Sequence, residues 1–197
     1  SFNIRLDVES DGENRWDIRK EKVTALMAYY EPDFIGAQEV QHHQLQYLLS
    51  SLGQYRSIGV GRDDGKTGGE YSCILYNHQR VEPERQSTFW LSATPDSVSR
   101  GWDAACHRVC TYGLFRIKAT GQLCWVFNTH FDHVGEVART SSARLIMERI
   151  QKLNRVYGYP VVLTGDFNAQ PTDEPVKYIA SHMTNSRSVS LQPAYGP

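Results

Sequence analysis

The spacing of apolar positions in the first half of the chain alternates between that of helices and that of strands. A helix is predicted over residues 17–30, where apolar side chains recur at helical spacing until Pro32. A second helix is predicted over residues 43–52, whose leucines form one stripe. Short apolar runs predict strands at residues 4–6, 34–37, 55–60 and 72–76. Strands and helices therefore alternate in this half of the chain.

The second half is richer in strands, which are predicted at residues 88–91, 109–117, 123–128 and 160–163. The turn residues at 119–121 make an antiparallel hairpin of the two middle runs. Helices are predicted over residues 136–157 and 174–182. This order indicates a mixed α/β domain with more than one sheet. No linker or repeat divides the chain, so residues 1–197 are expected to form a single domain.

Charge and composition exclude some classes of protein. The chain has 21 Lys and Arg against 22 Asp and Glu, a formal net charge of -1. A basic protein held to nucleic acid mainly through phosphates is therefore excluded, although a nuclease is not. No transmembrane segment is predicted, because no run approaches about 18 apolar residues. We expect a soluble monomer, cytoplasmic or exported after removal of a leader outside this sequence.

The four cysteines form no C-x-x-C pair and are expected to be buried thiols. A zinc site at Cys106, His107 and Cys110 would need a fourth ligand at a suitable spacing, and none stands out. A structural zinc site is therefore not expected.

Polar residues follow three of the apolar strands at the point where each strand ends. Gln38-Glu39 follows the first strand, residues 128–133 the second and residues 164–168 the third. Ligands of α/β sheets bind at such strand ends, so these residues are expected to share one crevice. Within residues 128–133, Asn128, His130 and Asp132 lie on one face of an extended chain.

The residue types at these strand ends suit a hard metal ion. Carboxylate and amide oxygens are the ligands of Mg²⁺ or Mn²⁺, and Glu39 is the best single candidate. Asp166 could take a proton from an attacking water, and His130 could donate a hydrogen bond to phosphoryl oxygens. The pattern therefore favours metal-assisted hydrolysis of a phosphate ester.

Four motifs carry a resemblance to a known family: residues 1–5, Gln38-Glu39-Val40, Asn128-Thr129-His130 and Gly165-Asp166-Phe167-Asn168. In this order they resemble the endonuclease/exonuclease/phosphatase superfamily, which has the pancreatic deoxyribonuclease fold. Residues 101–105 and 108–111 resemble a bacterial branch of it. The resemblance implies an α/β, four-layer α-β-β-α sandwich of two mixed β-sheets. It also implies divalent-metal hydrolysis of phosphate esters.

The resemblance implies roles for nine residues: Asp166, Asn168, His130 and Glu70 in catalysis, Glu39 and Asn3 at the metal, and Arg108, Trp102 and His133 at the substrate. Asp166 would orient or deprotonate the nucleophilic water, with Asn168 beside it. His130 would bind the phosphoryl group, and Glu70 would orient this histidine. Arg108 would hold a substrate phosphate.

Members of this superfamily usually continue into a strand with Ile-Asp and a final Ser-Asp-His, neither of which precedes Pro197. The sequence therefore resembles a domain that lacks its C-terminal strands. For a molecule ending at Pro197 we expect weak or no hydrolysis and an exposed sheet edge.

Two alternatives stay open. Residues 129–133 partly match the H-x-H-x-D-H motif of metallo-β-lactamase-type zinc hydrolases, although Asn128 stands where the first histidine is needed. The fold could also serve as a non-catalytic binding module. The substrate is a small phosphate ester or a nucleic acid, and the balanced charge tilts the expectation towards the small ester.

Overall fold

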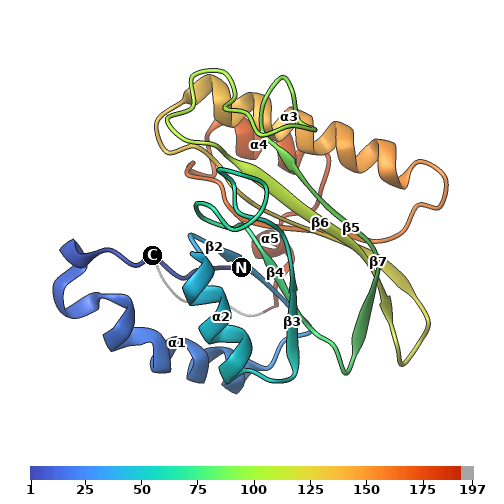
Figure 1. Cartoon of the computed structure of the whole chain (residues 1–197). Coiled ribbons are helices and arrows are strands. Elements are labelled where there is room, and N and C mark those ends of the chain that lie inside the picture. The colour runs from blue at the N-terminus through green and yellow to red at the C-terminus, as the bar shows by residue number, and fades with distance from the viewer. Residues whose placement is uncertain (192–197) are drawn as a thin grey trace.

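The structure is a computed structural model that describes residues 1–191, which form two four-stranded β-sheets flanked by helices (Figure 1). The elements in chain order are β1 (Phe2–Asn3), the 3-10 helix η1 (Glu9–Asn14), α1 (Trp16–Tyr30), β2 (Phe34–Gln38), α2 (His42–Ser51), β3 (Tyr55–Ile58), β4 (Ile74–Asn77), β5 (Val81–Trp90), β6 (Val109–Ile117), β7 (Leu123–His130), α3 (Glu136–Asn154), β8 (Val161–Asp166), α4 (Glu174–Ala180) and α5 (Ser186–Val189).

Both sheets are mixed. The first has the strand order β1-β2-β4-β3, and the second has the order β5-β6-β7-β8. Only the pairs β1–β2 and β7–β8 are parallel within these sheets of residues 1–191. The parallel register sets Asn3 beside Gln38 in the first sheet and His130 beside Asp166 in the second. Polar strand ends therefore lie next to each other within each sheet.

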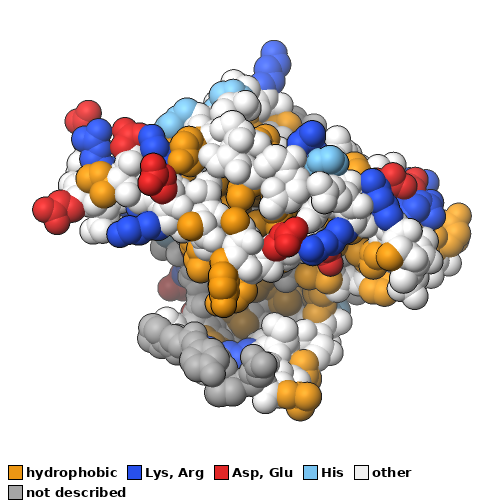
Figure 2. All heavy atoms as spheres, turned by 90° about the horizontal axis from the view of Figure 1, so that it is seen from below, with side chains coloured by type: hydrophobic (Ala, Val, Ile, Leu, Met, Phe, Trp, Pro, Cys, Tyr) orange, Lys and Arg blue, Asp and Glu red, His pale blue; other side chains and the backbone are white. Residues whose placement is uncertain are grey.

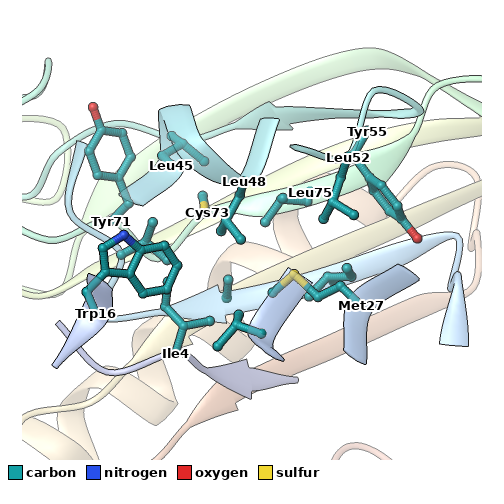
Figure 3. Close-up of a cluster of buried hydrophobic side chains, with 14 residues drawn as sticks. Ile4, Trp16, Met27, Leu45, Leu48, Leu52, Tyr55, Tyr71, Cys73 and Leu75 are labelled. Atoms are coloured by element: carbon teal, nitrogen blue, oxygen red, sulfur yellow. The ribbon is translucent and has the colours of Figure 1, made fainter. Parts of the chain in front are cut away.

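Each sheet buries its outer face under helices. A cluster that includes Trp16, Met27 and Leu48 joins α1 and α2 to the first sheet (Figure 3). A second cluster joins the second sheet to α3 and α4, which cover it (Figure 1). A third cluster, with Phe115 and Val126, fills the space between the sheets. The predicted four-layer α-β-β-α sandwich is confirmed.

A buried polar seam also joins the two sheets. Asn128 of β7 donates from Nδ2 to the carbonyl oxygens of Ala37 (2.9 Å) and Cys73 (2.8 Å) in the first sheet. Its Oδ1 accepts from Gln38 Nε2 at 2.6 Å and from Thr164 Oγ1 at 3.1 Å. These directional bonds fix the ends of β2, β7 and β8 side by side. Asn128 therefore binds the sheets together and does not face a substrate.

Most predicted elements are found, and the differences have local causes. The strand predicted at residues 4–6 is wrong, because the chain leaves the sheet after Asn3 and Arg5 adopts a φ of 60°. Strand β5 starts at Val81, seven residues earlier than predicted, because its first part is largely exposed and carries no apolar signal. The long helix ends at Asn154 rather than residue 157, and α5 was not predicted.

Strand β8 is an edge of its sheet within residues 1–191, and Val162 on it is exposed. None of the helices in this part of the chain has the length and apolar content needed to cross a bilayer.

All four cysteines are free thiols, and two of them are sealed in the core. Burial raises the pKa of Cys73 to about 12 and also raises that of Cys110. We expect a thiol reagent such as DTNB to reach at most Cys106 and Cys124 in the native protein, because a buried thiol lacks both access and thiolate character. Cys73 and Cys110 should react only in denaturant.

The double variant Cys106→Ser/Cys124→Ser is the control for this experiment, and it should show almost no reaction before unfolding. Reaction of a third or fourth thiol in the native wild-type protein would contradict the expectation.

Candidate active site

Asn3 brings two carboxylates together at the edge between the sheets. Its Nδ2 donates to Glu39 Oε1 at 2.8 Å and to Asp166 Oδ2 at 3.0 Å. Glu39 follows β2 in a left-handed conformation with a φ of 60°, and its Oε2 accepts from the backbone N–H of Leu6 at 3.1 Å. The structure therefore assembles both predicted metal-binding residues with the predicted catalytic aspartate.

Arg19 of α1 holds the loop that supplies this Leu6 N–H. Its guanidinium donates to the carbonyl oxygens of Ile4, Arg5 and Leu6. Arg5 also lies near Glu39, with 3.8 Å between its Nη1 and Glu39 Oε2. Non-glycine residues at positive φ are costly, and they persist where surrounding bonds hold them. Arg19 supplies such bonds for Arg5.

His130, Asp166 and Asn168 form the second part of the site. Asn168 Nδ2 lies 3.0 Å from His130 Nε2 and donates to the Phe131 carbonyl at 2.9 Å. Its backbone N–H donates to Asp166 Oδ1 at 3.1 Å, and His130 Nε2 lies 3.9 Å from Asp166 Oδ2. In this arrangement His130 Nε2 accepts, so the neutral ring carries its proton on Nδ1. That buried Nδ1 has no hydrogen-bond partner within residues 1–191.

The surroundings of His130 and Asp166 move their pKa values in ways that suit hydrolysis. Burial, and then the positive charge of Arg108, lower the pKa of His130 to about 4, against the opposing effect of Asp166 and Glu39. Burial acts to raise the pKa of Asp166, but hydrogen bonds from Asn3 and from the Asn168 N–H outweigh it and lower the pKa. At neutral pH an anionic aspartate therefore lies beside a neutral imidazole.

Glu70 is bound by a residue that the sequence did not single out. Arg62 Nη1 and Nη2 donate to the two carboxylate oxygens of Glu70 at 3.0 and 2.7 Å. Within residues 1–191, Glu70 makes no hydrogen bond to His130, which it was expected to orient. Both of its carboxylate oxygens accept from Arg62 instead. Burial raises the pKa of Glu70 despite the charge of Arg62. The sequence feature that could have indicated this ion pair is an arginine and a glutamate at opposite ends of one glycine-rich loop.

Arg108 and His133, two of the predicted substrate-binding residues, are in contact. Arg108 is 5% exposed, and its Nη2 donates to His133 Nδ1 at 3.0 Å. Its Nε donates to Asp132 Oδ2 at 3.4 Å, while its Nη1 has no partner within residues 1–191. Burial, and then the charge of Arg62, lower the pKa of Arg108. Trp102, the third predicted residue, lies on the loop before Arg108 and is exposed.

Asp132 ties this region to the start of α3. Its Oδ1 accepts from the N–H groups of Val134 (3.0 Å) and Gly135 (2.8 Å), and its Oδ2 accepts from Cys106 N at 3.3 Å. Burial acts to raise its pKa, but these backbone bonds outweigh burial and hold the pKa well below its usual value. The carboxylate therefore stabilises the fold in its charged form.

We expect Asp132→Asn to lower the free energy of unfolding by about 2–4 kcal/mol at pH 7, because one amide cannot satisfy these donors and Arg108 loses its counter-ion. A group whose pKa is lowered by folding contributes stability above its unfolded pKa of about 3.9, and the contribution is lost as the pH falls. The difference from wild type should therefore shrink below about pH 4.

Urea unfolding at several pH values measures this effect, with the exposed Asp96→Asn as the control. A difference of the same size at low and neutral pH would contradict the assigned role of the Asp132 charge.

The donor set around Asn3 fits a hard divalent cation. Two carboxylates converge there on the Nδ2 of Asn3, and Mg²⁺ commonly uses one or two protein carboxylates. The Asn3 amide donates to both carboxylates, and a cation between Glu39 and Asp166 could replace these two hydrogen bonds. Glu39 could therefore hold Mg²⁺ or Mn²⁺. Asn3 would join it by turning its Oδ1, which accepts from the Arg5 N–H at 2.9 Å, towards the ion.

A zinc site is less well supported. Within residues 1–191, Cys106, Asp132 and His133 are the one group of at least three His, Cys, Asp or Glu residues whose ligand atoms all lie within 4.8 Å of one another. Both Asp132 oxygens accept N–H groups, and His133 Nδ1 accepts from Arg108, whose positive charge disfavours a cation. His130 Nε2 faces Asn168, so the partial zinc-hydrolase motif of residues 129–133 does not converge on one point.

Comparisons with known proteins agree with this geometry. The model of the endonuclease/exonuclease/phosphatase family matches residues 1–194. A crystal structure of a family member from Bacteroides vulgatus is 46% identical with a TM-score of 0.88, covering 91% of this chain and 69% of that chain. A mannosyl-6-phosphatase from Bacteroides thetaiotaomicron is 39% identical with a TM-score of 0.89, covering 91% of this chain and 68% of that chain.

Mouse nocturnin is 25% identical over 187 residues, which is 88% of this chain. The chain spans 41% of the length of that protein. The match to the family model and the two bacterial structures agree with the family indicated by the sequence motifs. The chain therefore belongs to the endonuclease/exonuclease/phosphatase family.

Proposed function

We propose that the protein is a divalent-metal-dependent hydrolase of phosphate esters that acts on small molecules. The observation that carries the proposal is the convergence of Glu39 and Asp166 on the amide of Asn3, with neutral His130 beside them. The Bacteroides thetaiotaomicron relative is a mannosyl-6-phosphatase, which supports a phosphate ester of a small molecule as the substrate.

The residues can divide the chemistry as follows. Glu39 and Asn3 would hold Mg²⁺ or Mn²⁺, which supplies charge neutralisation at the phosphoryl oxygens and the leaving group. Asp166, anionic at neutral pH, accepts the proton of the attacking water. His130 binds the phosphoryl group without adding a positive charge, because it stays neutral. To donate from Nε2, the neutral ring must carry its proton there instead of on Nδ1 and exchange its contact with Asn168 for a phosphoryl oxygen.

The surface supports a small substrate over a long nucleic acid. On the face shown in Figure 2, Lys and Arg side chains are interspersed with Asp and Glu, so no broad basic field covers that face. The net charge of -1 agrees with this distribution. A polyanion would gain little from such a surface.

Removal of divalent ions with EDTA should abolish hydrolysis of mannose 6-phosphate and p-nitrophenyl phosphate, and Mg²⁺ or Mn²⁺ should restore it, because the carboxylate pair cannot itself neutralise a phosphate. Bis-p-nitrophenyl phosphate and poly(A) complete the substrate panel. The measurement is the initial rate, taken on the 197-residue chain and on a chain extended with the Asp-His segment that family members carry.

Turnover that survives EDTA would contradict the metal dependence. No turnover by either chain, with any substrate or metal, would favour the non-catalytic binding module. Turnover by the extended chain alone would agree with the expected need for the Asp-His pair.

A further inference from the structure

Trp102 is the one tryptophan of the four whose side chain is exposed. It is 42% exposed, whereas Trp16, Trp90 and Trp125 are at most 7% exposed. Its backbone has a φ of 51°, which is costly for a bulky side chain. Residues held in such conformations cluster at ligand-binding and catalytic sites. An exposed indole on a strained backbone therefore merits a functional explanation.

The residues on both sides of Trp102 hold it in place. A Cβ on Gly101 would lie 2.2 Å from the Leu91 carbonyl oxygen, so the backbone there is in close contact with the end of β5. The Asp103 carboxylate accepts the N–H groups of Val137 (3.2 Å) and Ala138 (2.7 Å) in the first turn of α3. The indole is therefore presented by a turn that is fixed at both ends.

Two exposed aliphatic side chains belong to the segment against which this turn is fixed. Val134 and Val137 are more than half exposed, and Val137 supplies one of the N–H groups bound by Asp103. We call Trp102, Val134 and Val137 the apolar rim. Exposed apolar groups that gather beside a polar site are typical of ligand-binding surfaces.

One buried carboxylate connects the apolar rim to the candidate active site. Asp132 accepts the N–H of Val134 and also the Nε–H of Arg108. Arg108 is positively charged, its Nη1 has no partner within residues 1–191, and its charge acts on both His130 and Asp166. A ligand with an anionic end at Arg108 would thus lie beside the segment that carries Val134.

We infer that the apolar rim binds the ring of the leaving alcohol, so that the preferred substrates are phosphate esters of ring-bearing alcohols. The inference rests on the proposed function and adds the substrate class. An indole face can pack against the C–H face of a sugar or stack on a nucleobase. Arg108 and His130 contact the phosphate, and Trp102 selects what the phosphate is attached to.

The kinetic test compares two ring-bearing esters, mannose 6-phosphate and AMP, with ring-free glycerol phosphate. Trp102→Ala should lower the ratio of kcat/KM for a ring-bearing ester to that for glycerol phosphate by about 10-fold, because stacking is lost only for the ring. Trp102→Phe should keep most of the ratio. A larger fall in the ratio for mannose 6-phosphate than for AMP would identify the preferred ring as a sugar, and the reverse would identify it as a base. Tyr29→Ala removes another exposed aromatic side chain, on α1, and is the control.

A binding measurement separates this inference from the proposed function. In the Asp166→Asn protein with Mg²⁺, acrylamide should quench mainly Trp102, and a ring-bearing ester should protect it while glycerol phosphate should not. Excitation at the red edge of tryptophan absorption avoids the absorption of AMP. Hydrolysis of all three esters with an unchanged ratio in Trp102→Ala would overturn the inference. If neither the 197-residue chain nor the extended chain hydrolyses any of them, the proposed function fails, and the quenching experiment alone decides the role of the apolar rim.

Discussion

Replacing Asp166 with asparagine should lower kcat for phosphate-ester hydrolysis by about 10³-fold, which is within the usual contribution of a general base. The substitution keeps the shape of the side chain and an oxygen that can accept from Asn3 or from the Asn168 N–H. It removes the charge that the hydrogen bonds around Asp166 maintain at neutral pH. The fold should persist, because the side chain is one-third exposed.

Steady-state kinetics with saturating Mg²⁺ measure this effect, and circular dichroism with a thermal melt checks the fold. Asp33→Asn is the matched control, because that carboxylate is exposed and pairs with Arg80 away from the site. Equal kcat values for wild type and Asp166→Asn would remove Asp166 from the mechanism.

Gly36→Ala should cause the largest loss of stability among the substitutions considered, about 3 kcal/mol or more. A Cβ at this position would lie 2.1 Å from Thr164 Oγ1 and 2.6 Å from Asn128 Oδ1. Both atoms belong to the polar seam, where Asn128 is buried and Thr164 Oγ1 is bonded to Asn128 Oδ1 and to the Phe127 carbonyl. The sheets must separate locally or the seam must lose hydrogen bonds.

Urea denaturation gives the free energy of unfolding for this comparison. Gly53→Ala is the control, because a Cβ there meets nothing within 4 Å, and its change should stay within about 0.5 kcal/mol. A Gly36→Ala protein without a cooperative transition would agree with the expectation. A loss below about 1 kcal/mol would contradict the close packing of the seam.

The sequence predicted the elements with a strong apolar period and missed those without one. Helix α1 and the β6–β7 hairpin are found within one or two residues of the prediction, because the apolar residues of α1 face one core and those of the hairpin are buried on both faces of its sheet. The first part of β5 was missed because its side chains are largely exposed and show no apolar pattern. Backbone hydrogen bonds to β6 hold this part of the strand in the sheet. Backbone pairing of this kind leaves little trace in the residue pattern.

The candidate site was predictable where the residues follow strands and unpredictable where loops contribute. Strand order sets Asn3 beside the end of β2, which precedes Glu39, and the packing of the two sheets adds Asp166; the motif order indicated that set. The partner of Glu70 could not be inferred in the same way, because the path of the loop between residues 61 and 70 decides which cation it meets. The same limit applied to Arg19, whose contact with the loop after β1 depends on where α1 packs.

The bonds of Asn128 have a consequence for how the site tolerates change. Apolar surfaces can slide over each other at little cost, whereas the three bonds of this amide that cross between the sheets, with Ala37, Cys73 and Gln38, would all be lost if one sheet moved by a single residue. Glu39 comes from one sheet and Asp166 from the other, so the relative position of the two carboxylates depends on the bonds of this amide. Substitutions that loosen the outer helices should therefore weaken the protein before they misalign its carboxylates.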